Sequence, residues 1–316
     1  MSFIRHFFFS FPYKLLIEYL KKGVVMLTKA PHQTIVALSN ASKHKAEFPI
    51  LSVILLAIMA GGGIAMGDIF WAHATVGVAK NLAPGIANFI GGFAFSAGLM
   101  MVVFFGGHLF TSSVLSSVSF AEKKVNFLGG VVSYWTVVWI FNFVGAILIA
   151  YMYYKSGLPL KYDGSILKHF AHLGAGKTSL SFEQAFLRGI FCNVFVCMAV
   201  WVAVAVEDGA GKIWGIAFLI AAFVASGYEH CVANMFIITE GLISKAHYLA
   251  QFGGDINAAA QALHMSVEHL ENLNIKSFLI NNELPVTLGN IVGGVIFVGL
   301  VALISHKPDI EAQNNH

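Results

Sequence analysis

Glu229 and His230 stand side by side within "FVASGYEHCVANMFIITEGL", a run of apolar and small residues from position 223 to 242. A bare carboxylate is costly in lipid, so Glu229 must be paired, protonated or hydrogen-bonded to free backbone amides. An imidazole titrates near about pH 6.5 and can serve as donor, acceptor or cation. Adjacent helical side chains point about 100° apart. We therefore expect His230 to face a pathway through the protein and Glu229 to brace the backbone, through the amides of a second interrupted segment.

Two plainer interpretations stay open for this pair. His230 could be a satisfied packing residue between helices, and Glu229 could pack against another subunit. A second polar segment, "FFGGHLFTSSVLSS", places His108 and Thr111 after another apolar run. Its hydroxyls can cap freed backbone groups or coordinate a passing solute. For His108, hydrogen bonding within its own loop is at least as good an interpretation as a role in transport.

The elements that position these residues must be membrane helices. Of the 316 residues, 57% are hydrophobic and only 11% are charged, and the mean hydropathy is +0.75. Soluble domains carry about 25% charged residues, and about 20 apolar residues form a spanning helix. The period-2 alternation of a barrel strand is absent, so we predict an all-α membrane protein. The six predicted spans are 48–72, 83–105, 130–154, 182–206, 213–242 and 285–305.

An internal repeat organises these spans into two halves, about 48–154 and 182–306. "NFVGAIL" at 142–148 in the third span recurs as "NIVGGVI" at 290–296 in the sixth. The preceding span of each half is interrupted, at about 106–113 and 226–234. Three spans per copy imply inverted repeats, and interrupted backbone is tolerated in a membrane only where protein or a cavity surrounds it. The two interruptions should therefore meet near the midplane.

The remaining segments are expected to lie outside the bilayer. Residues 1–47 form a cytoplasmic segment that opens with an amphipathic surface helix, and 307–316 form a cytoplasmic tail. With the N-terminus inside, eleven Lys and Arg face the cytoplasm and seven face the other side. Residues 245–283 are interpreted as a solvated connector with a short surface helix. The cysteines, which lack metal-site spacing, are expected to be small buried residues, and no metal or cofactor is expected. They are Cys192, Cys197 and Cys231.

Four motifs in order resemble the formate/nitrite transporter family. They are "GHLFTSS" after the second span, "NVFVCMAVW" in the fourth, "SGYEHCVANMF" in the fifth and "LPVTLGN" opening the sixth. The similarity runs from about "GVVMLTKAP" at Gly23 to Val301. It implies a homopentamer in the bacterial inner membrane, with an aquaporin-like inverted repeat and one pore per protomer. The solutes it implies are formate, nitrite, hydrosulfide and sometimes acetate or lactate, as anions or conjugate acids, and no nucleic acid is involved.

The resemblance also implies roles for individual residues. The central pore histidine of the family matches His230, its pore asparagine Asn193, its loop threonine Thr111 and its vestibule lysine Lys177. From composition alone, Lys177 would be a solvated loop residue and the apolar positions would be core. The apolar constriction residues match Phe95, Leu99, Leu109 and Phe223.

Two positions depart from the family pattern. Formate channels usually carry an acidic residue before the Leu-Phe-Thr of the first interruption, where this chain has His108. That change reverses the possible charge and leaves any account of loop gating in doubt. The lysine common in the segment matching "GVVMLTKAP" is replaced by Met26, although Lys29 follows nearby.

The hypothesis that follows is proton-linked passage of formate. Lys177 attracts the anion, and His230 donates or relays a proton while Asn193 and Thr111 orient the substrate. Nitrite and hydrosulfide are alternative solutes, and a simple anion channel with His230 as an electrostatic anchor is an alternative mechanism. A membrane redox protein with His108 and His230 as axial haem ligands is an alternative of another class. A neutral-solute channel is less favoured, because neither interruption contains Asn-Pro-Ala.

Overall fold

The structure is a computed structural model that describes residues 28–78 and 82–314. The predicted surface helix at the start of the chain and the segment around Met26 lie outside these residues. All regular secondary structure in the described residues is helical, apart from a single bridge between Thr28 and Val206. This confirms the all-α prediction.

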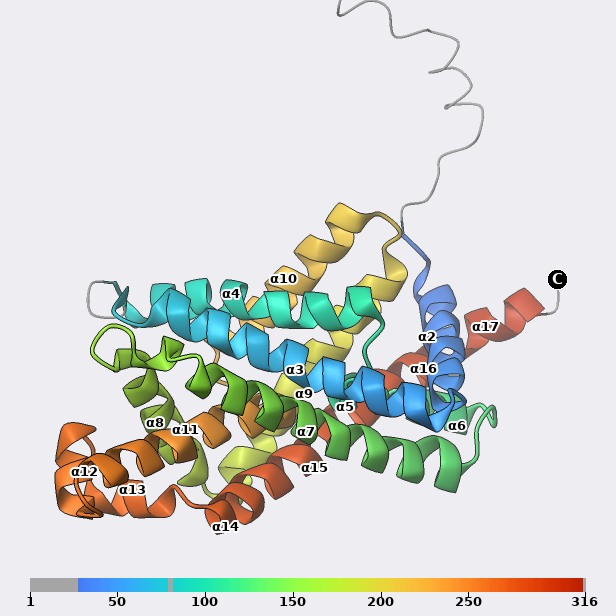
Figure 1. The fold of residues 1–316 in the computed structure, drawn as a ribbon. Coiled ribbons are helices and arrows are strands. Elements are labelled where there is room, and N and C mark those ends of the chain that lie inside the picture. The colour runs from blue at the N-terminus through green and yellow to red at the C-terminus, as the bar shows by residue number, and fades with distance from the viewer. Residues whose placement is uncertain (1–27, 79–81, 315–316) are drawn as a thin grey trace, which may run out of the picture.

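The helices follow one another along the chain in this order, where η marks 3-10 and π segments (Figure 1). They are α2 Pro31–Ala46, α3 Ile50–Thr75, α4 Pro84–Phe105, α5 Phe110–Ser113, α6 Ser116–Ala121, η2 Leu128–Ser133, α7 Tyr134–Lys155, η3 Leu158–Leu160, α8 Ser165–Thr178, α9 Phe182–Ala205, α10 Gly209–Ala225, α11 Cys231–Gln251, α12 Ile256–Ala262, α13 Val267–Asn272, α14 Ile275–Ser277, η4 Phe278–Glu283, α15 Leu284–Val292, η5 Gly293–Leu300, α16 Val301–Ser305 and α17 Lys307–Asn314.

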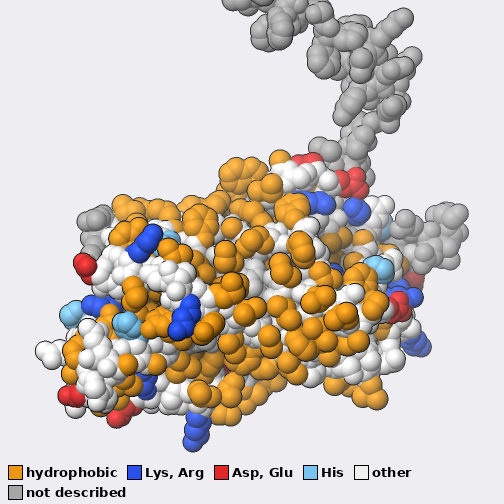
Figure 2. Space-filling model, viewed as in Figure 1, with side chains coloured by type: hydrophobic (Ala, Val, Ile, Leu, Met, Phe, Trp, Pro, Cys, Tyr) orange, Lys and Arg blue, Asp and Glu red, His pale blue; other side chains and the backbone are white. Residues whose placement is uncertain are grey.

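The long helices lie side by side, with shorter helices at both ends of the bundle (Figure 1). Helices α2, α6 and α17 lie at one end, and α8, α12 and α13 lie at the other. Figure 2 shows apolar side chains over the middle of one face, while charged side chains gather toward the two ends. This distribution is the one that a bilayer selects, since lipid tails accept apolar surface and the headgroup regions accept charge.

Five helical segments in the described residues are long and apolar enough to cross a membrane. They coincide with five of the six predicted spans. They are Ile50–Thr75, Pro84–Phe105, Leu128–Lys155, Phe182–Ala205 and Ile275–Ser305. The remaining predicted span, 213–242, is divided between α10 and α11. The break falls where the polar residues interrupt the apolar run.

Both predicted interruptions are real breaks in the helices, and each contains a glycine in the left-handed region. Helix α4 ends at Phe105 and is followed by Gly106 at φ +76°, while α10 ends at Ala225 before Gly227 at φ +73°. Glycine reaches this conformation without the clash that a Cβ would cause. The chain then turns and enters a new helix, at Phe110 in the first break and at Cys231 in the second.

Two buried asparagines satisfy the backbone groups that these breaks set free. In the first break, the Oδ1 of Asn142 accepts from Phe110 N at 2.8 Å, and its Nδ2 donates to His108 O at 2.9 Å and Ala57 O at 2.8 Å. An amide side chain carries one acceptor and two donors, so a single residue can make all three bonds.

Asn290 makes the same three bonds in the second break. Its Oδ1 accepts from Cys231 N at 3.0 Å, and its Nδ2 donates to Glu229 O at 3.0 Å and Gly189 O at 2.8 Å. Both asparagines are completely buried. The repeated motifs at 142–148 and 290–296 thus begin with asparagines that make equivalent hydrogen bonds.

The connector after α11 packs onto the helical bundle. The Leu263 and Leu270 side chains are fully buried in a cluster with Leu167 of α8. Its last residues, in η4, place Asn282 and Glu283 in the interior, where both are almost fully buried. The connector therefore contributes buried polar groups as well as surface helices.

The asparagine clamps generate a stability prediction. Asn142→Ala leaves the N–H of Phe110 and the carbonyl of His108 without their partner, and each unsatisfied buried group costs about 1 to 3 kcal/mol. We expect a loss on the order of 3 kcal/mol, seen as a lower apparent Tm of the purified protein in detergent. Asn257→Ala, on the exposed side of α12, is the matched control and should change stability by less than about 0.5 kcal/mol. Equal Tm values for the two variants would show that the clamp is dispensable.

Candidate functional site

His230 caps the N-terminus of α11 at the centre of the molecule. Its Nδ1 accepts a hydrogen bond from Ala233 N at 3.0 Å, and its Nε2 lies 2.9 Å from Thr111 Oγ1. The side chain is 2% exposed. A backbone N–H can only donate, so Nδ1 must present a lone pair. The neutral ring therefore carries its proton on Nε2 and donates it to Thr111.

Thr111 and Asn193 each keep one hydrogen-bonding group free. Because Thr111 Oγ1 accepts from His230, its own O–H has no acceptor among the described residues. Asn193 Nδ2 donates to Thr111 O at 3.0 Å and to Asn290 O at 2.6 Å, whereas its Oδ1 has no partner in the described part of the chain. The centre thus retains one free donor and one free acceptor.

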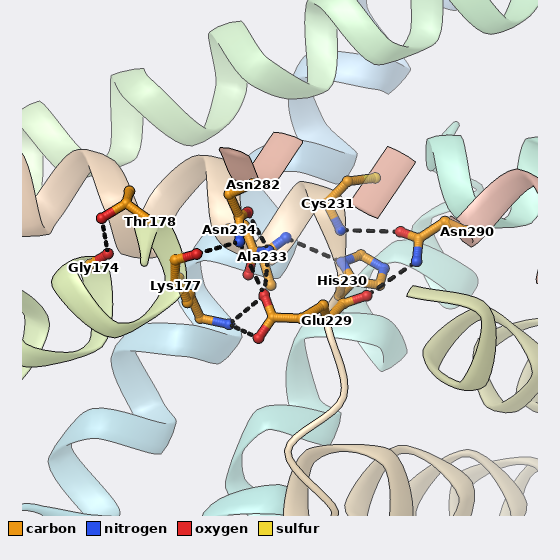
Figure 3. A network of polar contacts seen from close by, with 10 residues as sticks. All are labelled: Gly174, Lys177, Thr178, Glu229, His230, Cys231, Ala233, Asn234, Asn282 and Asn290. Atoms are coloured by element: carbon orange, nitrogen blue, oxygen red, sulfur yellow. Dashed lines mark hydrogen bonds and ion pairs between the residues drawn. The ribbon is translucent and has the colours of Figure 1, made fainter. Parts of the chain in front are cut away.

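Glu229 and Lys177 form a buried ion pair beside His230 (Figure 3). Lys177 Nζ lies 3.0 Å from both carboxylate oxygens. Glu229 Oε2 also accepts from Asn234 Nδ2 at 2.7 Å and from Asn282 Nδ2 at 3.3 Å. The pair is bidentate and surrounded by donors, which is the pattern of an ionised carboxylate. The braces of Glu229 are therefore one ammonium and two side-chain amides, where the sequence had led us to expect backbone amides of the first interruption.

A cavity of about 360 Å³ opens beside this ion pair. His230, Lys177 and Glu229 line it, together with Phe95 and Phe223. The rings of Phe95 and Phe223 meet edge to face with centroids 5.6 Å apart, and the Phe223 ring lies 6.0 Å from that of His230. Both phenylalanines are 3% exposed. They therefore form an apolar wall where the cavity reaches the histidine.

A second cavity, of about 280 Å³, is lined by Leu99, Ser113 and Lys45 and shares none of its lining residues with the first. Lys45 Nζ donates to Gly107 O at 3.1 Å, in the first break. Burial lowers the pKa of Lys45 to about 8, so it remains mostly charged at neutral pH. Lys45 and Lys177 are each the penultimate residue of a short helix, α2 and α8, and each contacts one of the two breaks.

The remaining predicted residues lie in the first break. Leu109 is fully buried at the N-cap of α5, the position that His230 holds in α11. His108 is also fully buried, with Nδ1 3.2 Å from Tyr134 Oη and no partner for Nε2 among the described residues. It occupies the position that Glu229 holds in the second break, since His108 N bonds to Leu56 O and Glu229 N to Arg188 O. The first break thus has a buried imidazole where the second has a carboxylate.

Sequence reasoning assigned no role to several residues that complete this site. They are Lys45, Asn142, Asn234, Asn282 and Asn290. Asn142 and Asn290 opened the repeated motifs, which was a usable signal. Lys45 could have been found by comparing the ends of the two short helices that precede each half. Asn282 gave no signal, because it lies at the end of a connector of irregular sequence.

The geometry of His230 bears on the haem alternative. Both of its ring nitrogens are engaged, one by Ala233 N and the other by Thr111 Oγ1. An axial ligand must offer a ring nitrogen to iron. Axial ligation would require His230 to abandon a helix cap or its bond across the two breaks, so the site does not fit this group.

Comparison with known proteins gives a consistent result. The family model described as "Formate/nitrite transporter" matches residues 32–304. The chain is 36% identical to a "Probable formate transporter" of Methanothermobacter thermautotrophicus over 285 residues, covering 85% of this chain and 94% of that protein. It is 35% identical to "Formate channel FocA" of Haemophilus influenzae, covering 83% and 89%.

A solved structure is similar over most of the chain. It is described as "Pentameric formate channel with formate bound", has 34% sequence identity and aligns with a TM-score of 0.72, covering 81% of this chain and 97% of that one. Residues 32–304, which the family model matches, contain both breaks, both cavities and nearly all of the five apolar helices. The chain is therefore a multi-pass membrane protein that belongs to the formate/nitrite transporter family.

Proposed function

We propose that this protein is a channel for formate, which it passes as the neutral acid through a pore between the two cavities. The observation that carries the proposal is the juxtaposition of both helix breaks at His230, Thr111 and Asn193, with a lysine-lined cavity on each side. The family relationship supports it, since relatives at 36% and 35% identity are described as a formate transporter and a formate channel. Formate uptake by purified protein in liposomes, compared at two pH values, is the direct test.

The architecture proposed for the pore is two inverted repeats of three spans each. The support lies in the paired hydrogen bonds: Asn142 and Asn290 make equivalent contacts, and each break donates to the first helix of its own half. In this arrangement, residues 48–154 and 182–306 are the repeats, and α10 with α11 forms the fifth span. An axis in the membrane plane would relate Lys45 to Lys177.

The proposed setting is the bacterial inner membrane, with both termini in the cytoplasm and five protomers in the assembly. The charge bias along the sequence supports the orientation. The pentameric state is that of the solved formate channel at 34% identity. In this orientation the Lys45 cavity faces the cytoplasm and the Lys177 cavity faces the opposite side.

Protonation of the substrate lowers the free-energy cost of passing the apolar constrictions. A desolvated ion is penalised by several kcal/mol. For an acid with a pKa near about 4, the neutral fraction at pH 7 is about one in a thousand, which corresponds to roughly 4 kcal/mol. The cost of desolvating the anion and the cost of protonating it are therefore comparable. Passage as the neutral acid is thus at least as feasible as passage as the anion. Phe95, Leu99, Leu109 and Phe223 would supply the apolar constrictions.

The free groups at the centre match a carboxylic acid. The Thr111 O–H can donate to the carbonyl oxygen of the acid, and Asn193 Oδ1 can accept from its O–H. A formate anion has no proton to give Asn193, so it would leave that oxygen unpaired. Nitrite and hydrosulfide also have neutral conjugate acids, and nitrous acid offers the same donor and acceptor pair. These solutes belong in the same uptake measurement.

A proton relay through His230 would require the N-terminal cap of α11 to open. Protonation of Nδ1 would abolish the bond from Ala233 N, which is the cap of α11. Losing an N-cap costs about 1 kcal/mol. His230 can therefore carry a proton only while the cap opens, and in the capped geometry it acts as a donor that orients Thr111.

Replacing Lys177 should separate its electrostatic role from its structural one. Lys177→Met should reduce formate uptake at low formate concentration by about tenfold, because the vestibule loses its attraction for anions. It should also destabilise the protein by about 3 to 5 kcal/mol, because Glu229 is left as an unpaired buried charge. Both effects are measurable, by uptake into proteoliposomes and by Tm in detergent.

The double variant Lys177→Met, Glu229→Gln should recover much of the stability but not the uptake. Lys155→Met, at the exposed end of α7, is the control for loss of a nearby positive charge. If the double variant transports formate as fast as the parent, Lys177 serves only to neutralise Glu229.

Two substitutions at His230 test the proton role. His230→Asn keeps a side chain that can cap α11, whereas His230→Phe removes both cap and Nε2 donor. We expect both to lower formate uptake by at least about tenfold and to weaken its rise toward acidic pH, with only the Phe variant losing about 1 kcal/mol of stability. Initial uptake rates at pH 6 and pH 8 give the comparison. Unchanged rate and pH dependence in His230→Phe would falsify a proton role for this residue.

A further inference from the structure

Asp68 is a buried carboxyl group in the wall of the Lys177 cavity. It lies on α3, with 1% of its surface exposed, and lines the same cavity as Lys177, Arg188 and His230. Neither carboxyl oxygen has a hydrogen-bond partner among the described residues. Buried carboxylates are normally paired or hydrogen-bonded, so an unpaired one that faces a cavity points to a proton or a ligand that the cavity supplies.

The charges around the cavity determine which protonation state of Asp68 favours binding of an anion. Lys177 and Arg188 supply two positive charges, and Glu229 is already engaged with Lys177 at 3.0 Å. If Asp68 is ionised, the two positive charges are matched by two negative ones. If Asp68 is protonated, one positive charge is left for the incoming anion, and the carboxyl gains an O–H that can donate to it.

The other ionisable groups near Asp68 do not take over this role. Helix α3 packs against α4, α7, α8 and α11, and the described part of α4 contains no titratable residue. The titratable or charged groups on α3, α7, α8 and α11 and around the cavity are His73, Tyr134, Tyr151, Tyr153, Tyr154, Lys155, Lys168, His169, His172, Lys177, Arg188, Tyr228, Glu229, His230, Cys231, Glu240, Lys245, His247 and Tyr248. Of these, His172 lines the cavity but is exposed to solvent, whereas Asp68 is buried. Three side chains already donate hydrogen bonds to Glu229, which leaves Asp68 as the carboxyl of the cavity wall without a partner among the described residues.

We propose that Asp68 is the proton-binding residue of this vestibule, and that a weak-acid anion and one proton enter the cavity together, with the neutral Asp68 carboxyl donating a hydrogen bond to the anion. The O–H bond on Asp68 forms with a proton from the solvent and breaks when that proton returns there. The inference rests on the proposed function only in that the anion is taken to be formate. It makes anion affinity at this mouth depend on pH separately from any later protonation of the substrate.

The test compares the KM for formate uptake at pH 6 and pH 8 on the Lys177 side of oriented proteoliposomes. Binding that requires one proton loses affinity tenfold per pH unit above the titration of the group. We expect the ratio of the two KM values to be at least about fivefold smaller in Asp68→Asn, which stays neutral, than in the parent. Glu240→Gln is the matched control, because Glu240 is equally buried and unpaired among the described residues but does not line the cavity. It should keep the parental ratio.

A spectroscopic measurement separates failure of this inference from failure of the proposed function. Infrared difference spectra, recorded on adding formate, nitrite or hydrosulfide to the purified protein, should contain the C=O band of a protonated carboxyl that is lost in Asp68→Asn and retained in Glu240→Gln. If the parent takes up no formate but nitrite or hydrosulfide induces the band, the solute assignment is wrong and Asp68 keeps its role. If no anion induces the band, or Asp68→Asn keeps the parental KM ratio, the inference is overturned.

Discussion

The hydrogen bonding of free backbone groups at membrane depth is the constraint on which this structure depends. A helix that breaks in lipid exposes N–H and C=O groups that water cannot reach, and each unpaired group costs several kcal/mol. Asn142 and Asn290 meet this cost with one acceptor and two donors apiece. Once the breaks are stable, the new helices begin at Phe110 and Cys231, and Thr111 and His230 come within 2.9 Å of each other.

A second layer of contacts holds the second break in place. Glu229 reaches Lys177 on α8, Asn234 on α11 and Asn282 at the end of the connector, so three separate elements converge on one carboxylate. Burying an ion pair is expensive unless the remaining lone pairs are also satisfied. The amides satisfy them here. An ammonium has three N–H donors, and Lys177 uses two on Glu229, so one donor has no acceptor among the described residues.

The two breaks are alike in backbone and different in charge. Gly106 and Gly227 adopt the same left-handed conformation, and His108 and Glu229 make equivalent backbone bonds. The side chains at these positions are nevertheless an imidazole beside Tyr134 and a carboxylate beside Lys177. The cap positions differ as well, with apolar Leu109 in one half and His230 in the other. The two breaks therefore share their backbone geometry and differ in the chemistry of their side chains.

The spanning helices and their breaks were largely predictable from the sequence, because the length of an apolar run and its interruption by polar residues are both local features of the sequence. The breaks at 106–113 and 226–234 appeared as polar residues inside apolar runs, and Asn142 and Asn290 appeared as the first letters of a repeat. The partners of Glu229 were not predictable in this way. Lys177 and Asn282 lie 52 and 53 positions from it in the chain, and only the packing of α8 and η4 against α11 brings them together. Lys45 was hidden for the same reason, since its contact with Gly107 depends on how α2 folds back onto the first break.

The protonation state of the centre follows from this framework. Because Ala233 N must donate to Nδ1, the capped His230 is neutral and its one proton points at Thr111. The O–H of Thr111 is thereby available as a donor. Asn193 donates both of its side-chain N–H groups to backbone carbonyls, so only its Oδ1 is available, as an acceptor. A site with one donor and one acceptor pairs fully with a neutral acid and only half with its anion. Positive charge is instead concentrated at the two cavities, at Lys45 and Lys177, where water can still reach a solute. In the proposed mechanism, the cavities attract the anion, the centre accepts the neutral acid, and a proton joins the anion between the two.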